Sequence, residues 1–363
     1  MNSPTVSVIM AAYNHAQFVE QAINSVLEQK GIDFEFLIAD DGSADKTGEV
    51  IASINDERVT FFPSEINRGA CVVTNELIER AAGEFIAVIN SDDYWPTQDK
   101  LAYQVKILRD NPDIGACFGR ANYIDKNGQP IHKSLLPLGT IFDQENRSQG
   151  QWLRKFFYFG NCICHPTILI RKSCYQEIGM YNNRLRQLPD YDMWIRLVKR
   201  YPIFISEREL INFRISPGNS VSSQTVKNSV RIINEHFLIS EFFFDNVTRA
   251  QLIEGFSDLL LVKDIPSEKH LHIEKILLYF SENKRIGKPH KVMGLLKINK
   301  ILNEPGYSNI IANEYKLDDH WFHQKMSQID TLQPQSLEKI KKRTRLIRRG
   351  IKWFAHLFHK DKV

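Results

Sequence analysis

Residues 6–14 read Val-Ser-Val-Ile-Met-Ala-Ala-Tyr-Asn, a short run of β-branched and apolar residues that ends in small and polar side chains. Apolar side chains then recur with helical spacing at Phe18, Ala22, Val26 and Leu27. A strand that leads directly into an amphipathic helix is the repeating unit of a parallel sheet. This stretch therefore predicts an α/β fold.

The same alternation continues to about residue 100, and the pattern then changes. A long apolar run at 114–124 is followed by Asn127-Gly128, a typical hairpin turn, which predicts antiparallel pairing in the second half of the sheet. The expected fold is thus a Rossmann-like mixed sheet with helices on both faces. Further strands are predicted at 34–39, 59–62, 84–89 and 166–171, and helices at 69–82 and 190–200.

A segment rich in Gly, Ser and Asn at 216–224 predicts a domain boundary. The expected organisation is a catalytic domain over residues 1–224, a helical region over 225–335 and a basic amphipathic tail helix over 336–363. Helices are predicted at 226–261 and 273–280. The helical region either packs on the catalytic domain or recognises an acceptor, and the sequence leaves both readings open.

The net charge of +4 over 363 residues conceals an uneven distribution. Residues 339–363 hold ten Lys or Arg and one Asp, a local charge of +9 that leaves −5 for the rest. The apolar side of this tail, which includes Trp353 and Phe354, suits an anionic membrane surface, and a helix docked on its own protein is the alternative. Nucleic acid is not expected as a partner, because no recognised motif accompanies the charge.

Five scattered cysteines, no long apolar run and no signal peptide predict a cytoplasmic protein with reduced thiols. With the tail, they predict a peripheral position on the inner face of the cytoplasmic membrane.

Three polar clusters follow predicted strands, at Ala11–Asn14, at Asp40-Asp41 and at Asp92-Asp93. In an open α/β sheet, ligands bind beyond the carboxyl ends of the strands, so these clusters predict one site. An acidic pair suits Mg²⁺ or Mn²⁺, which takes one or two carboxylates and completes its shell with diphosphate oxygens and water. No Walker lysine motif and no G-x-G-x-x-G are present, which disfavours kinases, GTPases and dinucleotide enzymes.

From Val6 to Ser223 the chain resembles the inverting glycosyltransferases of family 2, whose fold is called GT-A, of the type that builds bacterial surface polysaccharides. The resemblance rests on five stretches in the same order. They are residues 6–29, Asp40-Asp41-Gly42-Ser43, Asn67-Arg68-Gly69, Ser91-Asp92-Asp93 and Leu188–Arg196.

The resemblance implies a role for each matching residue. Tyr13 would stack on the nucleotide base, Asp41 would bind the base, and Ala11 would let the backbone approach. Arg68 would lie near the nucleotide or diphosphate, and Asp92 near the ribose or donor sugar. Two further assignments are Asp93 as the metal ligand and Asp190 as the general base, with Asp192 in a supporting role.

The family pattern is not matched everywhere. Pro189 stands where members often carry Glu, and Ser216 where many carry His, while Arg214 nearby could pair with phosphate. His165 is either an acceptor-site residue or a packed side chain. Cys162, Cys164 and His165 lack a second ligand pair, which disfavours zinc.

The expected function is metal-dependent, inverting transfer of a sugar from a nucleotide diphosphate, with UDP favoured, to a saccharide or lipid-linked saccharide. A catalytically degenerate scaffold at the membrane and a sugar-phosphate nucleotidyltransferase are the alternatives.

Overall fold

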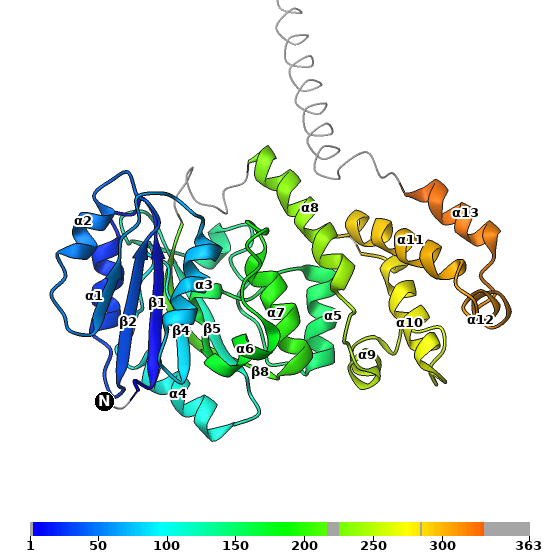
Figure 1. Ribbon diagram of the computed structural model, residues 1–363, viewed down its shortest axis with the longest axis horizontal. Coiled ribbons are helices and arrows are strands. Elements are labelled where there is room, and N and C mark those ends of the chain that lie inside the picture. The colour runs from blue at the N-terminus through cyan, green and yellow to red at the C-terminus, as the bar shows by residue number, and fades with distance from the viewer. Residues whose placement is uncertain (1–2, 216–224, 284, 330–363) are drawn as a thin grey trace, which may run out of the picture. The chain divides into compact units, whose positions relative to one another are not determined.

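The computed structural model describes residues 3–215, 225–283 and 285–329 (Figure 1). The chain divides into two compact units. Of the described residues, the first unit holds 3–215 and 246–256, and the second holds 225–245, 257–283 and 285–329. The predicted boundary at 224 stays a prediction, although α9 (Arg249–Phe256), which follows it, belongs to the first unit. Ser216 and the predicted tail at 336–363 lie outside the described residues.

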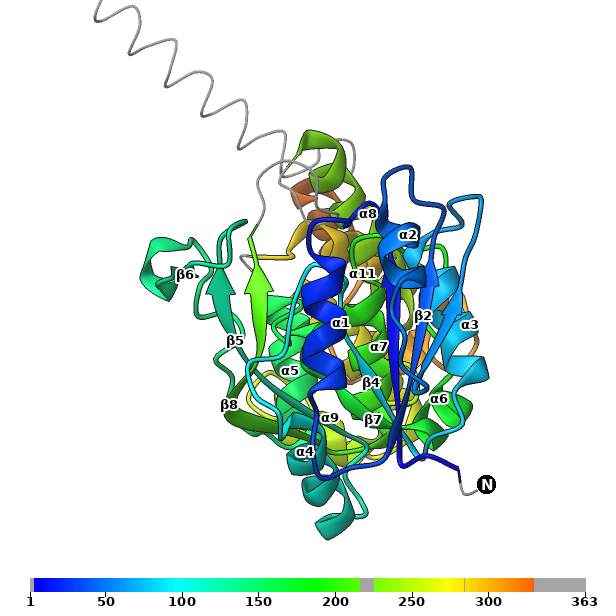
Figure 2. The ribbon, with the colours of Figure 1, turned by 90° about the vertical axis from the view of Figure 1, so that its left-hand side faces the viewer.

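An eight-stranded mixed sheet forms the centre of the first unit (Figure 2), as predicted. The strand order is β3-β2-β1-β4-β7-β5-β6, and β8 pairs with β5. Strands β1 to β4 pair in parallel, whereas β7 runs antiparallel to both β4 and β5. The strands are β1 (Val6–Ala12), β2 (Phe34–Asp40), β3 (Val59–Phe62), β4 (Phe85–Val88), β5 (Ala116–Ile124), β6 (Pro130–Ile131), β7 (Leu169–Arg171) and β8 (Ile203–Arg214).

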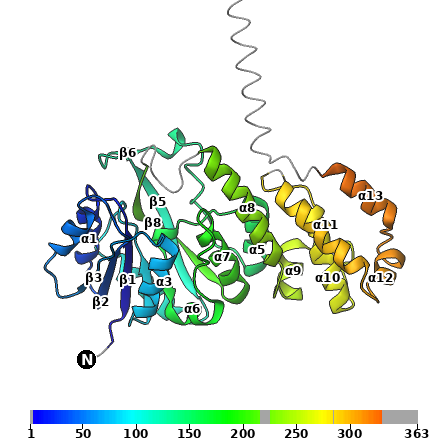
Figure 3. The same ribbon diagram turned by 45° about the horizontal axis from the view of Figure 1, so that its top comes forward.

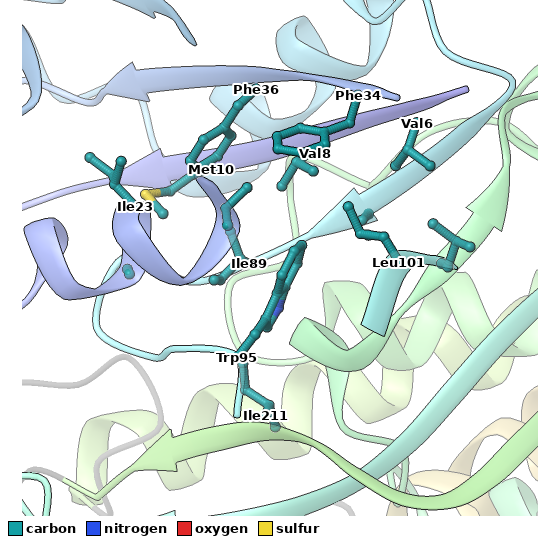
Figure 4. Close-up of a cluster of buried hydrophobic side chains, with 14 of the residues drawn as sticks. Val6, Val8, Met10, Ile23, Phe34, Phe36, Ile89, Trp95, Leu101 and Ile211 are labelled. Atoms are coloured by element: carbon teal, nitrogen blue, oxygen red, sulfur yellow. The ribbon is translucent and has the colours of Figure 1, made fainter. Parts of the chain in front are cut away.

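Helices cover the sheet because alternate strand residues need apolar partners. Val6, Val8 and Met10 of β1 share one face and lie in a buried cluster with side chains of α1 and α4 (Figure 4). In α1, the buried residues recur at the spacing of one helix face. The helices of this unit are α1 (Val19–Leu27), α2 (Thr47–Ala52), α3 (Ala70–Arg80), α4 (Lys100–Asp110), α5 (Gln149–Phe159), α6 (Lys172–Ile178), α7 (Pro189–Arg200) and α9.

A lysine lies inside this unit. Lys100, the first residue of α4, is fully buried, and its Nζ donates to Gln104 Oε1 at 2.8 Å. The same Nζ lies 4.2 Å from the centre of the Trp95 ring. Burial lowers the pKa of Lys100 to about 7, because the charged form loses its hydration.

The second unit is helical (Figure 3). Its core consists of Ile and Tyr side chains from α10, α11 and the α12 region. The prediction of continuous helix over 226–261 is wrong. The helix α8 ends at Phe242, and Asn246 then adopts a φ of 58°, which no helix accommodates. No helix among the described residues is long and apolar enough to cross a membrane. The helices are α8 (Val226–Phe242), α10 (Glu268–Leu277), α11 (Lys288–Leu302), α12 (Ser308–Asn313) and α13 (Asp319–Gln328).

Candidate active site

The carboxyl ends of three parallel strands meet at one edge of the sheet, where the predicted site residues follow them. In the register of the sheet, Ala11 lies opposite Ala39 and Ala12 opposite Asp40. β4 pairs alongside and ends at Val88, just before the acidic pair. The sheet thus brings the first three polar clusters together.

The loops that follow β1 and β2 are tied to each other. The backbone N–H of Asn14 donates to Ser43 Oγ at 2.9 Å, and the N–H of Ala44 donates to Asn14 Oδ1 at 2.8 Å. Asn14 adopts a φ of 54°, a conformation that Asn tolerates better than most residues. Tyr13, next to it, is 45% exposed, so its ring face is available to a planar ligand.

Asp41 is buried and binds backbone. Its Oδ1 accepts from the N–H of Arg68 at 2.7 Å and its Oδ2 from the N–H of Gly69 at 2.9 Å. These bonds hold the loop after β3 against the loop after β2. The assignment of Asp41 to the nucleotide base stays a prediction, and the structure adds a second role in shaping the site.

Gly42 allows this close approach. Its φ is +71°, and a Cβ on it would lie 2.5 Å from the carbonyl carbon of Ile66. Only glycine meets both conditions without strain. The Arg68 side chain extends from the adjoining loop and pairs with Glu76 of α3 at 2.5 Å.

The two members of the acidic pair face different surroundings. Asp92 is partly exposed, and its Oδ2 lies 3.9 Å from Nε2 of His15. Asp93 is buried, with Oδ1 accepting from the N–H of Arg214 at 2.8 Å and Oδ2 from Asn90 Nδ2 at 2.9 Å. Burial, followed by the charge of Asp92, raises the pKa of Asp93 well above its ordinary value.

His15 is a site residue that sequence reasoning missed. Its Nδ1 lies 2.8 Å from Ser91 Oγ, and its backbone N–H donates to Thr47 Oγ1 at 2.8 Å. Its position could have identified it, because His15 comes two residues after Tyr13 in the loop that follows β1.

Arg214, the last residue of β8, closes the edge from the other side. Its Nε donates to the carbonyl of Asp92 at 2.8 Å, and its Nη1 to the carbonyls of Asp125 and Lys126 at 3.0 and 3.1 Å. Its Nη2 donates to Gln21 Oε1 at 2.8 Å. The buried guanidinium is thus committed to protein oxygens, and the phosphate contact considered for it is disfavoured.

Asp190 lies in the first turn of α7. Its Oδ2 accepts from Asn161 Nδ2 at 2.5 Å and its Oδ1 from the N–H of Tyr191 at 2.8 Å. Pro189 opens the helix, a position that suits proline because the first turn needs no N–H donor there. Asp192 instead pairs with Arg196 at 2.9 Å, and its supporting role stays a prediction.

Asp93 and Asp190 both act electrostatically on the Cys164 thiol. The Cys164 thiol has its pKa raised by burial first, and then by the charges of Asp93 and of Asp190. The two carboxylates come from distant parts of the sequence, and their assignment to one site stays a prediction.

His165 is half-buried and packs against aromatic side chains, which favours the packed side chain of the two alternatives. Its Nε2 lies 2.8 Å from Tyr181 Oη, and its ring lies against Trp194. Burial lowers the pKa of His165 to about 4. The neighbouring Cys162 and Cys164 are buried, and neither forms a disulfide with another described cysteine.

The residues present fit a divalent ion shared with a ligand. In the described parts of the chain, no group of three His, Cys, Asp or Glu side chains could hold a metal by itself. Mg²⁺ and Mn²⁺ accept one or two carboxylates when phosphate oxygens complete the shell. Asp92 presents such a carboxylate, whereas both oxygens of Asp93 already accept hydrogen bonds. Asp93 as the metal ligand stays a prediction, and its placement favours Asp92 for direct contact.

The fold and sequence have known relatives. Solved structures of Staphylococcus aureus TarS resemble the chain, including residues 1–349 in complex with UDP, with a TM-score of 0.56 over 86% of this chain and 91% of that one. At 16% identity, this likeness concerns the GT-A fold alone.

Sequence relatives carry the assignment further. An uncharacterized glycosyltransferase of Methanocaldococcus jannaschii is 29% identical over 68% of this chain and 84% of its own length. WcaA of Escherichia coli, named as a candidate colanic acid biosynthesis glycosyl transferase, is 30% identical over 55% of this chain and 68% of its own length. The family model described as glycosyl transferase family 2 matches residues 7–178, which carry the strand ends and both acidic clusters of the donor side. The chain therefore belongs to glycosyltransferase family 2.

Proposed function

We propose that this glycosyltransferase moves a sugar from a UDP-sugar, with inversion and with Mg²⁺ or Mn²⁺, to a saccharide or lipid-linked saccharide. The observation that carries the proposal is the sheet edge where the loops after β1, β2 and β4 meet, with the exposed ring of Tyr13 and the partly exposed carboxylate of Asp92 on it. A single displacement needs a leaving-group side and a base in one site. Structures of TarS with UDP and with UDP-GlcNAc support UDP as the nucleotide.

The donor would occupy the edge formed by β1, β2 and β4. Tyr13 offers an exposed ring for the nucleotide base. The small side chain of Ala11, near the end of β1, lets the ligand approach the backbone. Asp41 and Arg68 belong to the loops beside this edge. Asp92 would contact the donor sugar and diphosphate region, with His15 beside it.

The acidic pair would hold the divalent cation. When bound, the ion neutralises the charge that develops on the departing diphosphate. We assign the direct contact to Asp92, since its carboxylate is partly exposed, and a supporting contact to Asp93.

Asp190 would remove the proton of the acceptor hydroxyl as its oxygen attacks the anomeric carbon. The diphosphate leaves from the opposite face of the sugar. Asn161 and the Tyr191 N–H each donate one hydrogen bond to the carboxylate, and the amino end of α7 also stabilises a negative charge there. These contacts orient Asp190 for that role.

The acceptor class rests on the relatives. TuaG of Bacillus subtilis, named as a candidate teichuronic acid biosynthesis glycosyltransferase, is 29% identical over 62% of this chain. With WcaA, it favours a role in polysaccharide biosynthesis. We also propose that the enzyme is cytoplasmic and contacts an anionic membrane through the basic residues of 339–363.

The test compares Asp190→Asn with Asp192→Asn, a matched change two residues along the same helix. We expect Asp190→Asn to lower sugar transfer by about 10²–10⁴-fold while UDP binding is kept. Asp192→Asn should retain far more activity. Thermal shifts with UDP and GDP, with and without Mn²⁺, identify the preferred nucleotide and test the metal requirement together.

Two outcomes would contradict the proposal. Asp190→Asn as active as the wild type would remove the assigned base. A wild-type protein that binds UDP but transfers no sugar from any UDP-sugar would indicate a scaffold. Asp92→Asn and Asp93→Asn then separate the metal roles, because the direct ligand should weaken Mn²⁺-dependent UDP binding more.

A further inference from the structure

Residues 126–143 form an excursion from the catalytic edge, here called the 126–143 loop. It begins just after β5, includes β6, and projects from the sheet beside β5 and β8 (Figure 2). Its tip exposes two large apolar side chains, Leu135 at 75% and Leu138 at 51%. Pro137, between them, is exposed as well.

The loop is structured, so these leucines are held outward. Lys133 Nζ pairs with Asp143 at 2.6 Å and closes the base of the tip. A Cβ at Gly139 would lie 1.9 Å from the carbonyl oxygen of Lys133, so the two arms pass in direct backbone contact. Phe142 anchors the returning arm, with its ring 6.0 Å from that of Phe213 in β8.

The base of the loop is fixed to the active site. The guanidinium of Arg214 binds the carbonyls of Asp125 and Lys126 as well as that of Asp92. The first residues of the loop and the acidic pair therefore share one anchor. Whatever binds the tip is held at the catalytic edge.

Apolar and charged groups are segregated along the loop. The carboxylates near it lie at its base, where Lys133 stands between Asp143 and Glu209 at 2.6 and 3.8 Å. From 126 to 142 the sequence has no Asp or Glu, and the exposed cationic or titratable side chains are Lys126 and His132. An apolar tip without acidic side chains, with His132 beside it and Lys126 exposed at the start of the loop, matches shallow insertion into the headgroup boundary of an anionic membrane.

We propose that Leu135 and Leu138 insert into an anionic membrane surface and so turn the catalytic edge toward the bilayer. This rests on the proposed function only in its consequence, which is that a lipid-linked acceptor reaches Asp190 from the membrane side. The contact is separate from the basic segment 339–363, which would add attraction without orienting the site.

The test places an environment-sensitive fluorophore on Leu135→Cys or, as a control, on Leu296→Cys in the full-length chain. Four native cysteines are buried and Cys71 is partly buried, so labelling of the unsubstituted chain gives the background. With phosphatidylglycerol vesicles, we expect a blue shift at position 135 and none at 296. No shift at 135 overturns the proposal, whether or not the chain co-sediments with the vesicles.

A second measurement compares Leu135→Ser/Leu138→Ser with Leu261→Ser/Leu296→Ser, whose leucines are 63% and 54% exposed in the second unit. We expect the loop variant to lose about a hundredfold in vesicle partitioning, because burial of each of the two leucines contributes on the order of one tenfold step. Equal losses in both variants would overturn the proposal. So would a response of the 135 label to soluble glycan, or to raised protein concentration without vesicles.

Donor hydrolysis in solution separates this proposal from the proposed function. The loop variant should hydrolyse a UDP-sugar at the wild-type rate. If the wild type hydrolyses and transfers no nucleotide sugar, the proposed function fails, and the fluorescence result still decides the membrane contact.

Discussion

Lys100 lies inside the first unit, and replacing it with Met should stabilise the protein in a pH-dependent manner. Burial lowers its pKa from 10.5 to about 7. Between these values the unfolded chain binds a proton that the folded chain releases, so wild-type stability increases as pH rises from 7 toward 10.5. The Met variant has no such dependence at this position, so its advantage is largest at and below pH 7 and shrinks above it.

The magnitude follows from the pKa difference. The gap between 10.5 and about 7 corresponds to about 5 kcal/mol, of which about 4 kcal/mol applies at pH 7 and about 2 kcal/mol at pH 9. Loss of the hydrogen bond to Gln104 offsets this by about 1–3 kcal/mol at every pH. We expect Lys100→Met to be more stable by about 2 kcal/mol at pH 7, with about 2 kcal/mol of advantage lost by pH 9.

Urea unfolding of the full chain at both pH values measures the change. Lys106→Met on the same helix is the control, because its side chain is 74% exposed and pairs only across the surface with Asp110. The control should change stability by less than about 0.5 kcal/mol at either pH. The same Lys100→Met advantage at pH 7 and pH 9 would refute the assignment of a buried, proton-releasing lysine, whatever its absolute size.

Three further changes test the site. Gly42→Ala forces a strained φ and a collision with the backbone of Ile66, so the affinity for UDP, measured by calorimetry, should fall at least about tenfold. An unchanged affinity would show that the loop adjusts freely. Arg214→Lys removes the forked guanidinium that donates to several protein oxygens, so the free energy of unfolding in urea should fall by roughly 2–4 kcal/mol. A change near zero would mean that water replaces those contacts. His165 has a pKa of about 4 because it is buried, so His165→Gln should leave the shape of the kcat/KM profile between pH 5 and 8 unchanged, and a displaced acidic limb would contradict this.

Most strands and helices of the first unit could be predicted from local sequence patterns. Apolar runs that end in polar residues located β1, β2 and β4, because a strand and its following loop are recognised within a few positions. β8 was not recognised, since Glu207, Arg208 and Glu209 interrupt its apolar pattern where the pairing with β5 shifts register. The break after α8 was also missed, because periodicity does not detect one residue with positive φ at Asn246.

The site residues were located more easily than their orientations. The sequence placed Asp92 and Asp93 together but could not tell which carboxylate faces inward, because this depends on the backbone N–H of Arg214, 121 residues away. The backbone partners of Asp41 could not be predicted either, because contacts with main-chain N–H groups do not depend on which side chain the partner residue carries. His15 lay within the recognised stretch, but only the fold shows that it lies beside Asp92.

The contacts of Arg214 also bear on the order in which the enzyme is synthesised. Gln21, Asp92 and Asp125 all leave the ribosome before this arginine, and Gln21 precedes it by 193 residues. At translation rates of about 5–20 residues per second, the acidic pair exists for roughly 6–24 seconds before its anchor is made. Asp190 itself is translated before β8 is complete. A nascent chain therefore carries every proposed catalytic group before it has the strand that fixes them, so premature termination before residue 214 should yield fragments without a formed donor site.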